Sequence, residues 1–150
     1  MQNLLFFLLF LFIGTASTAQ QIDESLLVAS LERTTCYGNC PYYEVKFYAN
    51  GFATYHGKKN VEFMGQYQAT IPKELLTKLL QKADLIGYHD LGNKYPVKGL
   101  GIIDFPVCIT SLKTEQGQKI IYNRNDAPQR LVDYQKFFDE LVEEIDWQKK

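Results

Sequence analysis

Apolar and polar residues alternate along several short segments of the chain, a pattern typical of β-strands with one buried face. The segment 43–47 reads Tyr-Glu-Val-Lys-Phe, and a second alternating segment, 52–56, follows it after Asn50-Gly51. Asn-Gly between two such segments is the strongest short-range signal of a β-hairpin. We expect two further strands in this half of the chain, at 25–33 and at 61–67, with a turn at 57–60 before the second.

Two registers of this first hairpin compete. A two-residue turn would place Val45 opposite His56, whereas a three-residue turn with Gly51 as a bulge would place Val45 opposite Tyr55. We expect the second register, because it gathers Val45, Phe47 and Tyr55 on one face of the sheet.

Two helices are expected, each beginning near a proline. Pro72 suits the first helical position, because a backbone N–H at that position would have no partner within the helix and proline lacks one. The apolar stripe of this helix would consist of Leu75, Leu76, Leu79, Leu80 and Ala83. The second helix follows Ala127-Pro128, and its stripe would consist of Leu131, Tyr134, Phe138, Leu141 and Ile145. Between the helices, 107–112 and 119–122 flank a turn at 114–117 and predict a second hairpin.

These elements follow one another in the order β-β-β-β-α-β-β-α. An antiparallel sheet of about five strands with two amphipathic helices predicts an α+β fold, a two-layer sandwich. The stretch from 91 to 106 contains several Gly and Pro residues and shows no alternation. Loops this long are uncommon inside small domains and are often functional.

The N-terminus carries an unbroken apolar run at 4–13, followed by small residues up to Ala19. This pattern is typical of a secretory signal peptide, and the run is about half the length that a membrane span needs. We expect cleavage near Ala19 and one globular domain over 22–150, exported to the periplasm or secreted, with no membrane span in the mature chain. The formal net charge of −1 argues against a nucleic-acid partner, which would require a basic surface.

Cys36 and Cys40 enclose a short segment that contains Gly38. Their spacing is compatible with a disulfide, a redox pair, a metal clip or two buried thiols. We expect a disulfide, because disulfides persist in the compartments of exported proteins and Gly38 can adopt the positive φ of a tight loop. Cys108, between apolar residues of an expected strand, would then be a buried free thiol, although its pairing with either other cysteine stays open.

The alternative is a thiol-redox or copper-binding protein in which Cys36 and Cys40 act as ligands, since soft thiolates suit copper. In copper chaperones with a Cys-x-x-x-Cys-Pro motif, that motif leads from a strand into a helix. Here an alternating segment and Asn50-Gly51 follow the cysteines, so we expect the motif to precede a hairpin. We therefore expect no metal site.

Three features resemble one family of small exported bacterial domains that is common in the Bacteroidota. They are the pattern Thr-x-Cys-Tyr-Gly-x-Cys-Pro-x-Tyr at 34–43, the turn at Asn50-Gly51, and Tyr55-x-Gly57 in the strand after it. Further similarity includes Asp104-Phe105-Pro106 and the start of the second helix. The family is known as a domain of unknown function, so the resemblance implies localisation and fold and no particular activity.

No catalytic constellation is visible: the chain has no nucleophile elbow, phosphate-binding glycine loop or zinc-protease motif. We therefore expect a binding or interaction module without a cofactor, for a protein or a small molecule, and regard a hydrolase as the least supported class. The expected contact surface comprises Tyr37, Tyr42, Asn93 and Asp104, together with the rest of the loop from Asn93 to Ile103. Tyrosine combines a large apolar ring with a polar tip, and Asn93 and Asp104 belong to the long irregular stretch.

Overall fold

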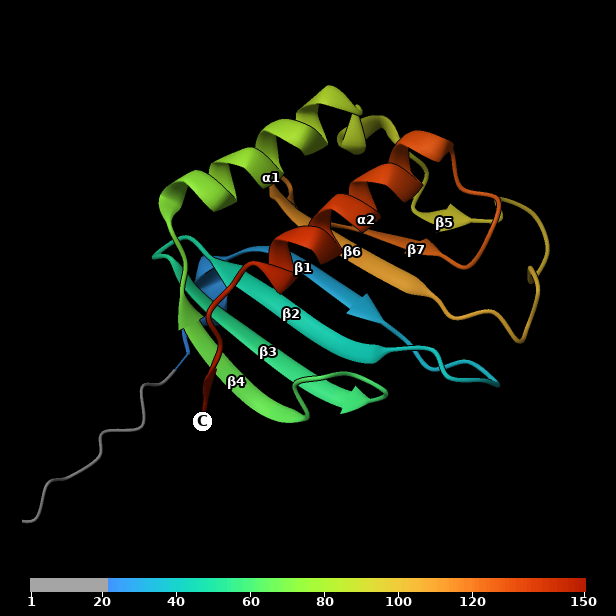
Figure 1. Ribbon diagram of the computed structural model, residues 1–150. Coiled ribbons are helices and arrows are strands. Elements are labelled where there is room, and N and C mark those ends of the chain that lie inside the picture. Colours follow the sequence, from blue (N-terminus) through green and yellow to red (C-terminus); the bar gives the residue numbers. More distant parts are fainter. Residues whose placement is uncertain (1–21) are drawn as a thin grey trace, which may run out of the picture.

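The computed structural model describes residues 22–150, which form one large sheet with two α-helices over one of its faces (Figure 1). The strands are β1 (Leu27–Arg33), β2 (Tyr42–Tyr48), β3 (Phe52–Lys59), β4 (Gly65–Thr70), β5 (Lys94–Tyr95), β6 (Cys108–Thr114), β7 (Gly117–Asn123) and β8 (Gln148–Lys149). The helices are α1 (Lys73–Leu85) and α2 (Gln129–Glu143), with short 3₁₀ helices η1 (Glu24–Leu26) and η2 (Tyr88–Asp90). The expected signal peptide lies outside the described residues.

The α+β class and the two helices are as expected, but the sheet is larger than the expected five antiparallel strands. It has eight strands in the order β5-β7-β6-β1-β2-β3-β4-β8. It is also mixed, because β5 runs parallel to β7 while every other pair is antiparallel. The outermost strands, β5 and β8, have two residues each, which is too short for alternation to reveal them.

The first hairpin has the expected register. Val45 lies opposite Tyr55, and Gly51 has a φ of +80°, which glycine adopts without a steric penalty. The amide of Gly51 donates to the carbonyl of Tyr48 at 3.0 Å. Val45, Phe47 and Tyr55 are all buried, so the choice of turn places these side chains in the core.

The prediction of a strand over 61–67 is wrong for residues 61–64. The preceding strand, β3, continues to Lys59, and β4 begins only at Gly65. Residues 60–64 instead fold over the neighbouring strand. A Cβ on Gly57 would lie 1.8 Å from the carbonyl oxygen of Phe63. The missing side chain of Gly57 is therefore what allows this segment to cross β3.

Both helices begin one residue later than expected, with Pro72 and Pro128 as N-caps. α1 is followed by Gly87 in the left-handed conformation, a common way to end a helix. Ile145 lies two residues beyond the end of α2, yet it is buried.

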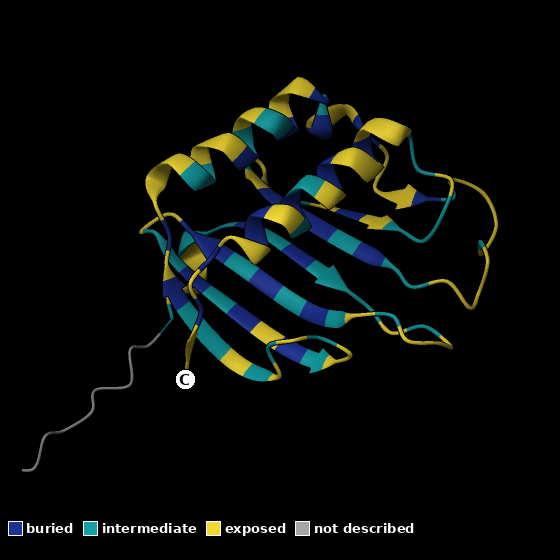
Figure 2. Cartoon of the chain, viewed as in Figure 1, coloured by how far each residue is buried: buried dark blue, intermediate teal, exposed yellow. Residues whose placement is uncertain are grey.

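The core lies between the helices and the sheet face that they cover, where the buried residues alternate along the central strands (Figure 2). Phe47 of β2 packs against Phe138 of α2, with ring centroids 5.2 Å apart. Tyr88 donates a hydrogen bond to the Thr110 hydroxyl at 2.8 Å, which satisfies both buried groups. Within residues 22–150, no helix has the length and apolar character needed to cross a bilayer.

Candidate functional site

Two loops project from one end of the sheet (Figure 1). Residues 34–41 join β1 to β2, and residues 96–107 join β5 to β6. The two loops are bonded at their bases, where the amide of Thr34 donates to the carbonyl of Val107 at 3.0 Å. In return, the amide of Val107 donates to the Thr34 hydroxyl at 2.7 Å. The strand order therefore places the cysteine segment beside the long irregular stretch.

The first loop contains the disulfide between Cys36 and Cys40, whose Cα atoms are 5.7 Å apart. The amide of Gly38 lies 3.3 Å from the Cys36 sulfur, and the Tyr37 side chain is 95% exposed. Cys108 is a free, buried cysteine, and burial raises its pKa to about 12. At neutral pH this thiol is protonated and shielded, which makes it a poor nucleophile and a poor metal ligand.

The second loop has a defined conformation. Gly101 has a φ of +69°, and a Cβ there would lie 2.4 Å from the Asn125 side-chain oxygen. That same oxygen accepts a hydrogen bond from the amide of Ile102 at 3.2 Å. Arg124 Nη1 donates to the carbonyl of Ile103 at 3.0 Å. Side chains that follow β7 therefore hold the loop by its backbone and leave its own side chains free.

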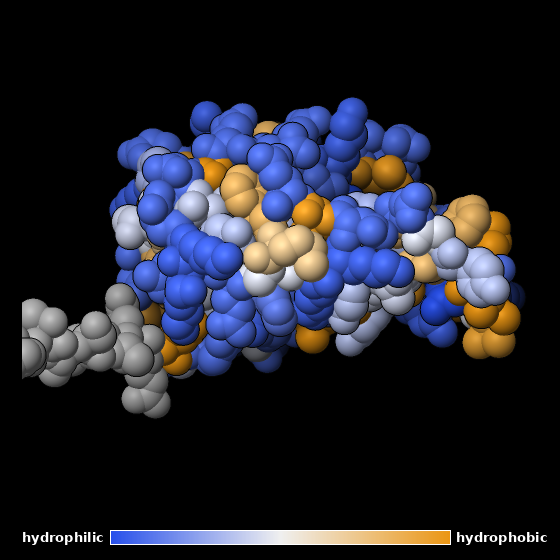
Figure 3. Space-filling view, turned by 60° about the horizontal axis from the view of Figure 1, so that its bottom comes forward, coloured by the Kyte–Doolittle hydropathy of each residue, from blue (hydrophilic) through white to orange (hydrophobic). Residues whose placement is uncertain are grey.

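Those free side chains are mostly apolar. We call residues 97–105 the apolar loop, because it exposes five large hydrophobic side chains. They are Val97 (76% exposed), Leu100 (73%), Ile103 (71%), Ile102 (50%) and Phe105 (48%). Hydrophobic surface gathers at this end of the molecule (Figure 3). Single exposed apolar residues are ordinary, whereas a cluster of them is a feature often found at interaction sites.

A cavity of about 440 Å³ lies between the apolar loop and the outer strands. Its apolar walls are formed by Tyr95, Leu100, Ile103, Val107 and Tyr122. The remaining lining residues are Lys94 and Arg124, both cationic. The cavity thus combines an apolar interior with positive charge, and no carboxylate from the described part of the chain lines it.

A second cavity, of about 560 Å³, opens between α2 and the segment that crosses β3. At its base, Arg33 forms an ion pair with Asp139, which also accepts a hydrogen bond from the Tyr43 hydroxyl. Burial, and then the negative charge of Asp139, raise the pKa of Tyr43 well above its ordinary value. Tyr43 is therefore protonated and donates to Asp139, so these polar groups satisfy one another and tie α2 to the sheet.

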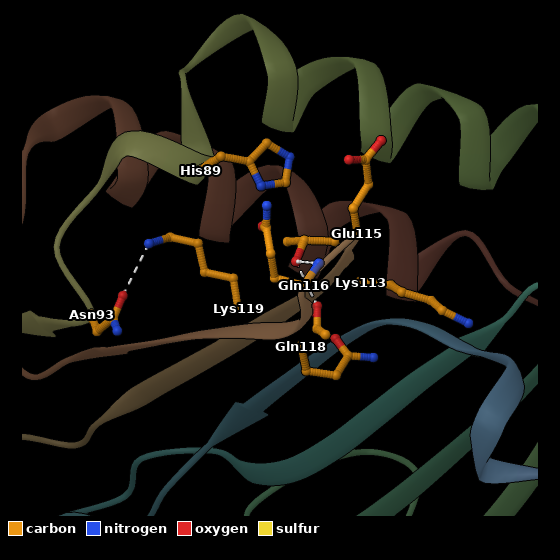
Figure 4. Close-up of a pocket in the computed structure, with 9 residues that line it drawn as sticks. His89, Asn93, Lys113, Glu115, Gln116, Gln118 and Lys119 are labelled. Carbon is orange, nitrogen blue, oxygen red and sulfur yellow. Dashed lines mark hydrogen bonds between the residues drawn. The ribbon is translucent and has the colours of Figure 1, made fainter.

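A third cavity is an open groove of about 820 Å³ at the turn between β6 and β7 (Figure 4). His89 faces it from η2, and Lys119 reaches across to Asn93, with the Lys119 Nζ and the Asn93 side-chain oxygen 2.9 Å apart. The same Nζ donates to the carbonyl of Leu91 at 2.7 Å. No cluster of His, Cys, Asp or Glu within residues 22–150 could hold a metal ion, and the groove contains no paired acid and base.

The structure brings together only some of the residues expected to form a contact surface. Tyr37 and Asp104 lie in the two projecting loops, and both are exposed. Tyr42 starts β2, where its ring lies under the Lys58 ammonium, 4.5 Å from the ring centroid. Asn93 lines the groove at the β6–β7 turn instead.

Sequence reasoning missed Tyr122 and Arg124 as lining residues, whereas Lys94 belongs to the 93–103 loop that the sequence analysis assigns to the contact surface. Lys94 and Tyr122 are brought together by the parallel pairing of β5 with β7. A two-residue strand leaves no periodic signal, so nothing local to either residue indicates this cavity.

Most of the chain matches a known family of domains. The pattern of a domain of unknown function, DUF6438, matches residues 28–142. The chain belongs to the DUF6438 family. The match includes all but the first residue of β1, the strands β2 to β7, both loops at the end of the sheet and all but the last residue of α2. A search of curated proteins found no match.

Proposed function

We propose that this DUF6438 protein is an exported binding module whose contact surface is the apolar loop and the cavity beside it. The proposal rests on one observation: the backbone of the apolar loop is held in place, while its apolar side chains are exposed. Gly101, Asn125 and Arg124 order the loop before any partner arrives. A pre-ordered surface binds more tightly because less conformational entropy is lost on association.

Export is the second part of the proposal. The apolar run at 4–13 and the small residues up to Ala19 support a cleaved signal peptide, and 22–150 would be the mature globular domain. The Cys36–Cys40 disulfide is compatible with an oxidising, extracytoplasmic compartment. The pattern at 34–43 supports kinship with exported proteins of the Bacteroidota.

Within this proposal the disulfide has a structural role. The disulfide closes the 34–41 loop, and at the base of this loop Thr34 is hydrogen-bonded to Val107. The disulfide therefore helps to order the neighbouring end of the apolar loop. Tyr37 and Asp104 would form the polar margin of the contact surface, while Tyr42 and Asn93 lie outside the apolar loop.

Binding of a neutral, polarity-sensitive dye such as Nile red tests the proposal. We expect saturable fluorescence enhancement with the wild-type protein and its loss in Leu100→Ser. Leu85→Ser is the matched control, because Leu85 is an exposed leucine (83%) at the end of α1, away from the cavity. Both variants should stay within about 0.5 kcal/mol of the wild-type stability. Equal dye binding by the wild type and Leu100→Ser would refute the proposed surface.

A further inference from the structure

We infer that the cavity beside the apolar loop binds the monomeric anion of an aliphatic acid, with its hydrocarbon chain against the walls and its carboxylate toward Lys94 and Arg124. This inference rests on the proposed function and specifies its ligand. It follows from the chemistry of the lining residues, the charge at the cavity and the contrast with the cavity beside α2.

The walls favour a ligand without internal polar groups. Leu100, Ile103 and Val107 contribute aliphatic side chains, and Tyr95 and Tyr122 add aromatic rings. A peptide would bring backbone amides and carbonyls into this apolar interior. Each would lose its hydrogen bonds to water without finding a partner, which is unfavourable. A plain alkyl chain has no such groups to satisfy.

The charge favours an anionic head group. Within residues 22–150, Lys94 and Arg124 are the only charged residues that line the cavity, and both are positive. The guanidinium of Arg124 has five N–H donors, and the bond to the Ile103 carbonyl uses Nη1. Its planar fork is suited to bidentate binding of a carboxylate. Lys94 is exposed, so its ammonium can follow the head group.

The cavity beside α2 shows the opposite balance. It is lined by one cation, Arg33, and by three carboxylates, Glu62, Asp139 and Glu143. The Arg33 charge is already paired with Asp139. The carboxylates would repel an anion there. An anionic ligand should therefore bind in the cavity beside the apolar loop and not in the cavity beside α2.

The size favours a single small molecule over a bilayer. About 440 Å³ falls within the range of pockets that enclose small ligands, roughly 300–1,000 Å³. A concave site of this size can enclose one chain, whereas a bilayer would meet only the projecting side chains of the apolar loop. We therefore commit to the free acid, and a bilayer surface becomes an outcome of the test.

Calorimetric titration of the purified protein with dodecanoate, below its micellar concentration, tests the inference. Dodecanol keeps the chain without the charge, and dodecyltrimethylammonium reverses the charge. We expect one dodecanoate per chain, with dodecanol bound about tenfold more weakly and the cationic amphiphile more weakly again.

Variants locate the head group. Lys94→Gln should weaken dodecanoate binding about fivefold and leave dodecanol binding unchanged, and Lys94→Arg should retain the wild-type affinity. Lys98→Gln is the matched control, because Lys98 is a nearby exposed lysine, in the apolar loop that follows β5, and does not line the cavity. Leu100→Ser should weaken both ligands.

The possible results separate the inference from the proposed function. Dodecanol binding as tightly as dodecanoate, or equal effects of Lys94→Gln and Lys98→Gln, would overturn the inference. Nile red binding without dodecanoate binding would overturn it and leave the proposed function standing. Flotation with phosphatidylglycerol vesicles in the absence of monomeric dodecanoate binding would overturn it in favour of a bilayer surface, and failure of every apolar probe would overturn both.

Discussion

Arg33, at the end of β1, forms an ion pair with Asp139 in the C-terminal half of α2 and so joins the sheet to the helix that covers it. Arg33 Nε donates to Asp139 Oδ1 at 3.3 Å, and Nη2 donates to Oδ2. The Tyr43 hydroxyl adds a third hydrogen bond to the same carboxylate. The two side chains of the pair are only about a quarter exposed, 25% and 26%.

Asp139→Asn should destabilise the protein, because it leaves the partly buried guanidinium without an opposite charge. Breaking a fully buried pair costs about 3–5 kcal/mol, and partial exposure reduces the expected loss to about 2 kcal/mol. The measurement is the free energy of unfolding in urea. Glu140→Gln is the control, because it breaks an exposed pair with Lys136 on the same helix and should cost less than about 0.5 kcal/mol. Similar losses in both variants would contradict the structural role of the buried pair.

The disulfide should contribute modest stability. Closing a five-residue loop corresponds to about 2 kcal/mol in the chain-entropy treatment, so Cys36→Ser should lower the free energy of unfolding by about that amount. Thiol alkylation should detect no reactive cysteine in the folded protein, Cys108 alone after unfolding, and all three cysteines after unfolding with reductant. Stoichiometric copper in the purified protein that disappears in Cys36→Ser would instead support the metal-binding alternative.

Gly57→Ala should strongly destabilise the folded protein, because the new Cβ would overlap the carbonyl oxygen of Phe63. Backbone atoms cannot rotate away as a side chain can, so we expect a loss of about 3 kcal/mol, at the upper end for overpacking. Gly38→Ala provides the comparison, since its nearest neighbour would be the Cys36 sulfur at 3.9 Å. Thermal unfolding of both variants measures the difference, and a mild Gly57→Ala would show that residues 60–64 do not cross β3 as described.

The apolar loop offers a matched pair of glycines. Gly99 and Gly101 both have positive φ, +78° and +69°, but only Gly101 is in close contact with other residues, Asn125 and Pro96 among them. Alanine at either position meets a conformational penalty of about 1 kcal/mol, and Gly101→Ala also displaces the Asn125 side chain. We expect Gly101→Ala to reduce Nile red binding more than Gly99→Ala. The reverse order would show that the contact with Asn125 does not shape the site.

Alkaline pH should destabilise the fold partly through Cys108. Burial raises its pKa from 9.0 to about 12, so the folded state holds the proton more tightly than the unfolded state. The protonated Cys108 thiol makes its full contribution to the free energy of unfolding below pH 9. This contribution is lost as the pH rises from 9 to 12, and the free energy of unfolding then falls by up to about 1.4 kcal/mol per pH unit. Urea titrations across this range should show a shallower decline for Cys108→Ala. Parallel curves for the two proteins would contradict the raised pKa.

The features that were predictable from the sequence depend on residues close together in the chain. Asn50-Gly51 and the alternating segments around it define the hairpin and its register, because turn geometry and side-chain alternation are local. Both helices follow in the same way from their leucine and aromatic spacing and from the prolines before them. The disulfide is also local, since Cys36 and Cys40 are separated by only three residues.

Contacts between distant segments decided the rest. The segment 61–64 alternates like a strand, yet it crosses β3 because Gly57 leaves room for its backbone. The short strands β5 and β8 exist only because longer strands offer them hydrogen bonds. Lys94 and Arg124 likewise line one cavity only after β5 has paired with β7. Sequence alone determined the local elements and their apolar faces, whereas the site depends on which edges and loops meet, which tertiary packing decides.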